Sequence, residues 1–241
     1  MKAELTKLCK RLRLSQNLVE NALDIEAPTH PEYLAEVLRR ELTHRETMRR
    51  NRLLKQAGFP SLKLFRDFVF DEVKLPVPLT VEELKNTRFL DDRRNLIFYG
   101  NVGTGKTHLA TALGIAACQA GKQVRFFRTA SLVNQLVQAR KTGQLDKLLK
   151  QFGKLDLLIC DEWGYVPLDR DGAQLLFHVV ADCYETRSLI ITTNLEFVKW
   201  VNVFYDEKMT AAMIDRLVHH SHLVIFDGPS YRVRHSLMAS G

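Results

Sequence analysis

Residues 100–107 read Gly-Asn-Val-Gly-Thr-Gly-Lys-Thr, which is a complete G-x-x-x-x-G-K-[ST] motif. A short apolar run at 95–99 precedes it, and a helix-like pattern from Lys106 to about Ala120 follows and ends at Gly121. In a loop between a strand and a helix, successive backbone N–H groups turn toward phosphate oxygens, and the helix directs its positive end at the same charge. The motif therefore predicts a phosphate-binding loop at the edge of an α/β sheet.

The two polar side chains at the end of this motif predict an ATP site that uses Mg²⁺. Lys106 is expected to reach the β- and γ-phosphates, and the Thr107 hydroxyl is expected to ligate Mg²⁺. The residues expected to bind the nucleotide are Gly100, Asn101, Val102, Gly103, Thr104, Gly105, Lys106, Thr107 and His108.

Two further strand ends carry polar residues suited to hydrolysis. Asp161 and Glu162 follow the apolar run 155–160 directly. Asp161 is placed to hold Mg²⁺ through water, and Glu162 to polarise the attacking water as a general base. Asn194 closes the apolar strand 189–193 and is expected to hydrogen-bond the γ-phosphate and the lytic water, although an Asn also often only terminates a strand.

The rest of the chain from residue 95 alternates between strand and helix patterns. Strands are expected at 123–128, 155–160, 189–193 and 222–226, and helices at 131–140, 144–152, 172–186 and 209–219. This alternation predicts a parallel sheet covered by helices on both faces.

The N-terminal part differs in composition and charge. Residues 1–67 contain 14 Lys and Arg against 9 Asp and Glu, so they carry +5 of the net charge of +7. We expect a small helical, basic N-terminal domain at 1–60 that binds DNA or a partner, a linker and entry to the core at 61–94, and the ATPase domain at 95–241. The N-terminal candidates for DNA contact are Arg49, Arg50 and Arg52.

These motifs, in this order, resemble the phosphate loop, Walker B and sensor I elements of AAA+ ATPases. The chain is most similar to the IstB/DnaC-like group, and within it to IstB, the transposition helper ATPases of insertion sequences. The matching stretches are 105–110, 157–164, 188–194, 215–221 and 230–232.

The resemblance implies roles that spacing alone does not. Arg216 corresponds to the arginine finger that reaches a neighbouring subunit's γ-phosphate, which implies a homo-oligomer with shared ATP sites. The helices between 130 and 152 resemble the insertion of the initiator branch. Their basic residues are candidates for DNA contact and equally for a solvated helix face: Arg140, Lys141, Lys147, Lys150 and Lys154.

The resemblance also implies a departure at the C-terminus. Only 25 residues follow Arg216, too few for the three-helix lid of a complete AAA+ module. Arg232 is a candidate to replace a lid contact with phosphate, or to contact a neighbour, or to be a basic tail residue. Arg187, just before the sensor strand, is a similar open candidate.

The resulting hypothesis is a cytoplasmic bacterial ATPase that assembles on duplex DNA, with weak sequence preference, and stimulates a separate transposase. The alternative is a replicative helicase loader of the DnaC type, which would share the same active site. A small-molecule kinase is disfavoured by Glu162 and Arg216, and a non-hydrolysing scaffold by the complete set of Lys106, Asp161 and Glu162. No apolar stretch suggests a membrane span or an export signal.

Overall fold

The computed structural model describes residues 1–204 and 206–234. It contains two compact units, Met1–Arg52 and Leu53–Gly241. The smaller unit consists of α1 (Lys2–Arg11), α2 (Leu18–Leu23) and the first part of α3 (His30–Ala57). The end of α3 belongs to the larger unit, where Leu53 and Ala57 are buried in the core.

The larger unit is built on a six-stranded sheet in the order β1-β6-β2-β5-β4-β3. Its strands are β1 (Val73–Lys74), β2 (Asn95–Gly100), β3 (Val124–Arg128), β4 (Leu157–Asp161), β5 (Ser188–Thr193) and β6 (Ser221–Phe226). All neighbouring pairs are parallel except β1 with β6. The predicted α/β fold with a parallel sheet is therefore confirmed, with an antiparallel edge strand added.

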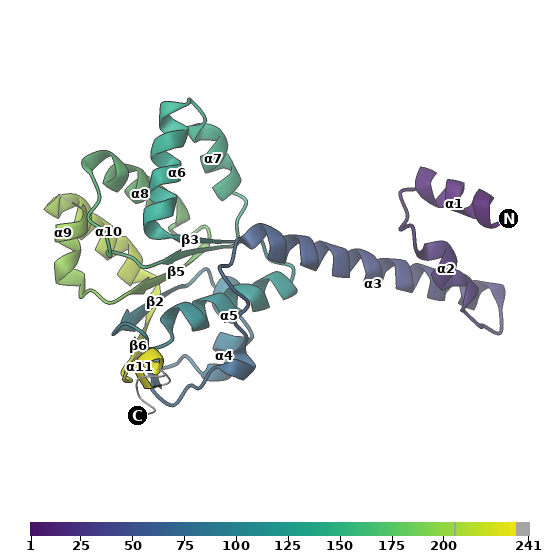
Figure 1. Ribbon diagram of the computed structural model, residues 1–241, viewed down its shortest axis with the longest axis horizontal. Helices are drawn as coiled ribbons and strands as arrows, with labels where there is room; N and C mark the ends of the chain where they lie inside the picture. Colours follow the sequence, from purple (N-terminus) through teal and green to yellow (C-terminus); the bar gives the residue numbers. More distant parts are fainter. Residues whose placement is uncertain (205, 235–241) are drawn as a thin grey trace. The chain divides into compact units, whose positions relative to one another are not determined.

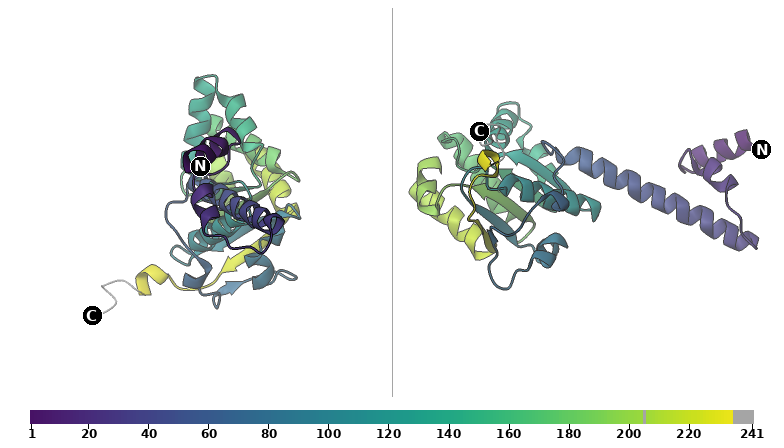
Figure 2. Two further views of the ribbon diagram at one scale, coloured as in Figure 1. Left: turned by 90° about the vertical axis from the view of Figure 1, so that its right-hand side faces the viewer. Right: turned by 60° about the horizontal axis from the view of Figure 1, so that its bottom comes forward.

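Helices cover both faces of this sheet (Figures 1 and 2). The α-helices after α3 are α4 (Val81–Lys85), α5 (Lys106–Gln119), α6 (Thr129–Lys141), α7 (Leu145–Phe152), α8 (Arg170–Cys183), α9 (Val201–Phe204), α10 (Glu207–His219) and α11 (Tyr231–Arg234). Single 3-10 turns lie at Phe65–Asp67, Arg88–Leu90 and Phe197–Trp200.

Successive side chains of the apolar strands point alternately into two hydrophobic cores. On β4, Leu157 and Ile159 pack with α5, whereas Leu158 and Cys160 pack with α6 and α8. A strand buried on both faces has no reason to alternate polar and apolar residues, because each successive side chain enters one core or the other. This explains why the strands appear in the sequence as continuous apolar runs.

Residues 61–94 are part of the larger unit and pack onto its core. Their side chains at Phe65, Phe68 and Phe70 pack against the α5 core, and Leu84 is fully buried. β1 extends the sheet at its β6 edge. The boundary between the two compact units lies after Arg52, within α3, whereas the sequence predicts it after residue 60.

The described segment after α10 bears on the predicted absence of a three-helix lid. Within 1–204 and 206–234, α10 is followed only by β6 and the one-turn helix α11, drawn in yellow in Figure 2, so these residues form no three-helix lid. Arg216 and Arg232 lie on α10 and α11 respectively.

Candidate active site

The phosphate-binding motif forms a tight loop between β2 and α5, as predicted. Gly105 directly precedes α5 with a φ of +100°, a left-handed value that disfavours side chains. A Cβ there would also lie 2.9 Å from the Phe68 ring. The loop therefore depends on glycine at this position, and its N–H groups begin the helix whose positive end would face phosphate.

Lys106 is folded back onto this loop. Its Nζ donates hydrogen bonds to the carbonyl oxygens of Gly100 at 2.8 Å and Asn101 at 2.6 Å. The pKa of Lys106 is lowered from 10.5 to about 8, chiefly by burial, while the charge of Asp161 opposes the shift and that of Arg232 adds to it. Among the described residues the half-buried Lys106 ammonium has carbonyl oxygens but no ion-pair partner beside it, so a phosphate would stabilise its charged form.

Asp161 and Thr107 form the oxygen-rich centre of the site. The Thr107 hydroxyl donates to Asp161 Oδ1 at 2.9 Å, and Asp161 is only 3% exposed. Thr192, in the neighbouring strand, also donates to Oδ1, at 2.5 Å. A carboxylate and a hydroxyl side by side are the donors that Mg²⁺ prefers, so these residues fit the expected metal.

Glu162 leaves the end of β4 in a strained conformation. Its φ is +58°, a value uncommon for a residue with a side chain and enriched at functional sites. The Thr192 side chain and backbone accept hydrogen bonds from the N–H groups of Glu162 and Trp163, which stabilises this turn. The Glu162 carboxylate is 48% exposed and lies 3.6 Å from Arg128 Nε. The carboxylate therefore points away from the core and is accessible to water.

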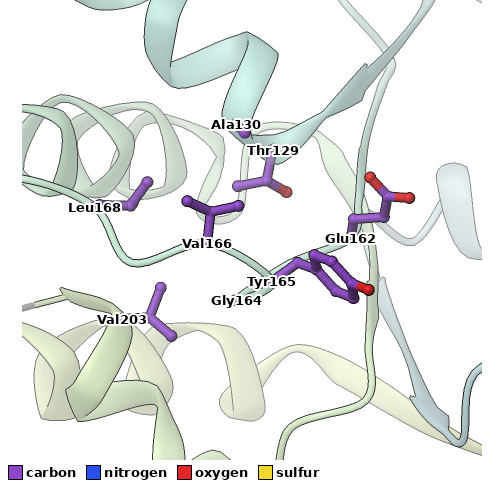
Figure 3. Close-up of a pocket in the computed structure, with 8 residues that line it drawn as sticks. All are labelled: Thr129, Ala130, Glu162, Gly164, Tyr165, Val166, Leu168 and Val203. Atoms are coloured by element: carbon purple, nitrogen blue, oxygen red, sulfur yellow. The ribbon is translucent and has the colours of Figure 1, made fainter.

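A small pocket lies beside Glu162 (Figure 3). Its volume is about 30 Å³, and mostly apolar side chains surround it: Ala130, Tyr165, Val166, Leu168 and Val203, with Thr129 and Glu162 as the polar members. This space suits a water molecule rather than a nucleotide base.

Asn194 directly follows β5 and is exposed. It lies at the carboxyl end of the sheet, where β2 and β4 also end.

The C-terminal segment packs against the phosphate loop. From the sequence, Arg232 was the only residue of this segment suggested as a phosphate contact. The Tyr231 N–H donates to the Gly103 carbonyl oxygen at 3.0 Å. A Cβ on Gly103, whose φ is +84°, would lie 2.1 Å from Ser230 Oγ. The Arg234 guanidinium in turn pairs with Glu72 at 2.8 Å. The structure thus closes one side of the loop with residues from the end of the described chain.

The segment before β1 contacts the opposite side of the loop and accounts for His108. The His108 ring lies 3.0 Å from the Leu64 carbonyl oxygen and 5.3 Å from the Phe68 ring. Its side chain therefore anchors this segment, so only its backbone is placed to contribute to nucleotide binding. Arg187 lies before β5, at the other end of the sheet, and donates to the Phe152 carbonyl oxygen at 2.6 Å.

Arg216 packs within its own chain. Its guanidinium lies 5.1 Å from the centre of the Phe177 ring on α8. Its Nη1 is buried without a hydrogen-bond partner among the described residues. A buried guanidinium nitrogen without a partner is unfavourable, and an incoming anion would satisfy it.

The candidate DNA-binding residues of α6 and α7 fall into two groups. Arg140 forms an ion pair with Asp171, so part of its charge is already compensated. Lys141, Lys147, Lys150 and Lys154 are exposed, and none has an ion pair among the described residues. The structure therefore leaves four of these five side chains available to an anionic partner.

The N-terminal candidates for DNA contact also fall into two groups. Arg49 and Arg52 line an open cleft of about 390 Å³ within the smaller unit, together with Arg13, His44 and Arg45. Arg50 does not line this cleft and lies 3.9 Å from Glu46 on its own helix.

Comparison with known proteins decides the family. The family model described as IstB-like ATP binding protein matches residues 4–239. The chain belongs to the IstB-like family of ATP-binding proteins.

Individual relatives agree with this assignment. A protein of insertion sequence IS5376 from Geobacillus stearothermophilus, named for ATP binding, is 35% identical over 97% of this chain and 95% of its own length. The corresponding protein of insertion sequence IS21 from Pseudomonas aeruginosa is 35% identical over 96% of this chain and 89% of its own length. This IstB-like chain is therefore similar over nearly its whole length to proteins named for insertion sequences.

Two solved structures share the α/β fold of the larger unit. DnaA from Aquifex aeolicus bound to AMPPCP superimposes with a TM-score of 0.56 and 19% identity, over 73% of this chain and 54% of that one. DnaI superimposes with a TM-score of 0.52 and 15% identity, over 75% of this chain and 93% of the DnaI chain. In the described parts of this IstB-like protein, no helix is long and apolar enough to cross a membrane.

Proposed function

We propose that this IstB-like protein hydrolyses ATP in a Mg²⁺-dependent reaction and uses the nucleotide to assemble on DNA and stimulate a separate transposase. The main support for ATP hydrolysis is that Lys106, Thr107, Asp161 and Glu162 lie together at the carboxyl end of the sheet. ATP binding itself follows from the family.

The residues present fit this reaction. Lys106 would exchange the carbonyl oxygens of Gly100 and Asn101 for phosphate oxygens, which are stronger partners because they are charged. Thr107 and Asp161 would hold Mg²⁺, which when bound neutralises charge on the phosphate oxygens. Glu162 would accept a proton from water at the γ-phosphate, and the strained turn would keep its carboxylate out of the core.

Arg216 is proposed to complete the site of an adjacent subunit. The support is its buried, unpartnered Nη1 together with the family resemblance. Arg216→Ala should bind ATP nearly normally but hydrolyse it slowly. Mixing Arg216→Ala with Lys106→Ala should restore part of the activity, because mixed interfaces combine one intact loop with one intact arginine. Absence of any recovery in a phosphate-release assay would contradict the assignment.

DNA and transposase are proposed as partners on separate grounds. Exposed lysines on α6 and α7 and the basic cleft of the smaller unit offer cations to phosphate. The names of the relatives link similar chains to insertion sequences.

A strand-transfer assay tests the whole proposal. A candidate transposase from an insertion sequence of this type would be incubated with its terminal DNA and a plasmid target, with and without this protein and ATP. Insertion should rise only when both are present, and Lys106→Ala should abolish the effect. If the protein instead increases loading of a replicative helicase onto single-stranded DNA and leaves insertion unchanged, the helicase-loader alternative holds.

A further inference from the structure

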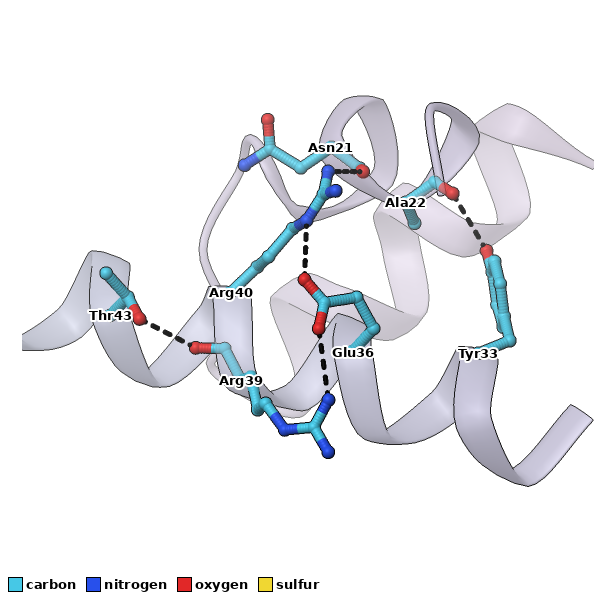
Figure 4. A network of polar contacts seen from close by, with 7 residues as sticks. All are labelled: Asn21, Ala22, Tyr33, Glu36, Arg39, Arg40 and Thr43. Atoms are coloured by element: carbon cyan, nitrogen blue, oxygen red, sulfur yellow. Dashed lines mark hydrogen bonds and ion pairs between the residues drawn. The ribbon is translucent and has the colours of Figure 1, made fainter. Parts of the chain in front are cut away.

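Several arginine side chains of this chain are held by carboxylates. Arg39 and Arg40 both pair with Glu36 on α3 (Figure 4). Arg234 pairs with Glu72 at 2.8 Å. In such a pair the carboxylate accepts N–H groups of the guanidinium and compensates its positive charge, so less of both is left for another anion.

Arg216 is held by an aromatic ring instead. Its Cζ lies 5.1 Å from the centre of the Phe177 ring, and no carboxylate forms an ion pair with it within residues 1–204 and 206–234. The face of a ring attracts a cation, but the ring carries no negative charge and has no oxygen to accept an N–H group. Phe177 therefore positions the guanidinium without compensating its charge.

The two helices that carry this pair are packed firmly on each other. Met213 and Leu217 of α10 are buried in the same core as Leu176 of α8. The Tyr184 hydroxyl lies 3.1 Å from His219 Nδ1, which joins the C-terminal ends of the two helices. The contact between ring and guanidinium is therefore made between two elements whose spacing is fixed by the core.

The core itself does not require an aromatic residue at position 177. Phe177 is only partly buried and packs at the margin of the core, next to the equally half-buried Ile214. A leucine would fill apolar space of this kind at little cost, since volume-conserving apolar changes are tolerated best. What a leucine lacks is the ring face turned to Arg216.

We propose that Phe177 is a positioning residue for Arg216, holding the guanidinium with its charge uncompensated until it meets the γ-phosphate of an adjacent subunit. This inference rests on the proposed ATPase function and on the role proposed there for Arg216. Phe177 acts only through that side chain. A preformed position reduces the side-chain entropy that is lost when the guanidinium binds phosphate in the transition state, so the ring affects kcat rather than ATP binding.

Steady-state ATP hydrolysis by Phe177→Leu tests the role of the ring. Its kcat should fall by about tenfold while KM for ATP stays nearly unchanged, because the lost interaction serves the transition state. Phe177→Tyr keeps the ring face and should restore most of the rate. The matched control is Phe127→Leu, since Phe127 is a half-buried ring of the same core that lies beside Phe152 instead of a cation. It should keep the wild-type kcat.

Combined variants separate positioning from a general loosening of the fold. In an Arg216→Ala background, Phe177→Leu should cause no further loss of kcat, because the ring has nothing left to hold. Phe177→Leu mixed with Lys106→Ala should regain part of the activity, since the mixed sites combine an intact loop with a positioned arginine. Phe177→Leu mixed with Arg216→Ala should regain none.

The outcomes distinguish this inference from the proposed function. Wild-type kcat in Phe177→Leu beside slow hydrolysis by Arg216→Ala would overturn the role of the ring and leave that of the arginine intact. An equal loss in Phe127→Leu, a further loss in the double variant, or a slow Phe177→Tyr would also overturn it. Wild-type hydrolysis by Arg216→Ala would contradict the role proposed for the arginine and, with it, this inference.

Discussion

At the residue scale, Lys106 is the residue of the candidate active site whose pKa is changed by its surroundings. It is buried among carbonyl oxygens, and its pKa is lowered to about 8 chiefly by that burial. Its charge is therefore partly lost just above neutral pH before any nucleotide binds. A phosphate beside it would favour the ammonium form and reverse the shift.

This predicts pH-dependent ATP affinity. Below pH 8 the lysine is already charged, whereas above pH 8 binding must first take up a proton, so affinity should fall by up to about tenfold per pH unit. Titration calorimetry at pH 7 and pH 9, in buffers of different ionisation enthalpy, measures both the affinity and the proton uptake. Lys106→Arg, which stays charged, should bind less tightly but show no such dependence; equal wild-type affinity at both pH values would contradict the prediction.

The sequence identified these reactive residues because they are neighbours within two short motifs. Lys106 and Thr107 share one motif, and Asp161 and Glu162 share another. Thr192, Thr129 and Ser230 were missed because they reach the site only through the strand order and the C-terminal fold. Thr192 donates to Asp161 because β5 lies beside β4, and Thr129 donates to the Asp161 carbonyl oxygen from the start of α6.

At the element scale, the main feature is the contact between the phosphate loop and the C-terminal segment. Tyr231 donates to Gly103, Ser230 fills the space where a Gly103 side chain would lie, and the Arg234–Glu72 pair holds α11 beside β1. These interactions supply one side of the site in a chain whose described residues form no three-helix lid. Displacing the segment should therefore disturb the loop.

Gly103→Ala should weaken ATP binding by about tenfold, because the added methyl group collides with Ser230 while the backbone is strained by about 1–2 kcal/mol. Gly121→Ala is the matched control: its φ is +82°, but nothing lies within 4 Å of the added Cβ. It should lose similar stability in thermal unfolding and bind ATP normally.

Adding Ser230→Gly to Gly103→Ala should recover part of the affinity, since it removes the colliding hydroxyl. Equal ATP affinity in Gly103→Ala and Gly121→Ala, measured by fluorescence with a labelled nucleotide, would show that the C-terminal segment does not shape the loop.

The helices and strands from residue 95 onward could be predicted closely, because each apolar run is bounded by polar or glycine residues. The two-residue strand β1 and the short helices α4, α9 and α11 could not, since they contain too few residues to show a period. Residues 61–94 resembled a linker because of Pro76 and Pro78. Their aromatic side chains nevertheless pack on the core, a tertiary effect with no local pattern.

At the scale of the whole molecule, each of the two units has a group of exposed basic side chains that belongs to no part of the ATP site. The main candidates for contact with DNA are the exposed lysines of α6 and α7 and the cleft that contains Arg49 and Arg52. Lys and Arg side chains contact phosphates rather than base edges in this kind of surface, so the charge predicts binding that varies little with sequence.

Reversing two of these charges should weaken binding to all duplexes alike. Lys147→Glu with Lys150→Glu should lower DNA affinity several-fold and reduce the salt dependence, measured by fluorescence anisotropy between roughly 50 and 200 mM salt. The control is Lys63→Glu with Lys208→Glu, which changes net charge equally at two exposed lysines elsewhere. Equal losses in both pairs, or a flat salt response, would contradict a specific role for α7.

The central claim is that Lys106 and Glu162 belong to one ATP-hydrolysing site with separate roles in binding and chemistry. The most direct measurement follows bound ATP and released phosphate in the same sample, with Mg²⁺ and DNA present, for Glu162→Gln. Glutamine keeps the shape of the side chain but cannot accept the proton, so ATP should bind at wild-type affinity while phosphate release falls by at least about a hundredfold. Wild-type phosphate release by Glu162→Gln, or loss of ATP binding in that variant, would contradict the account.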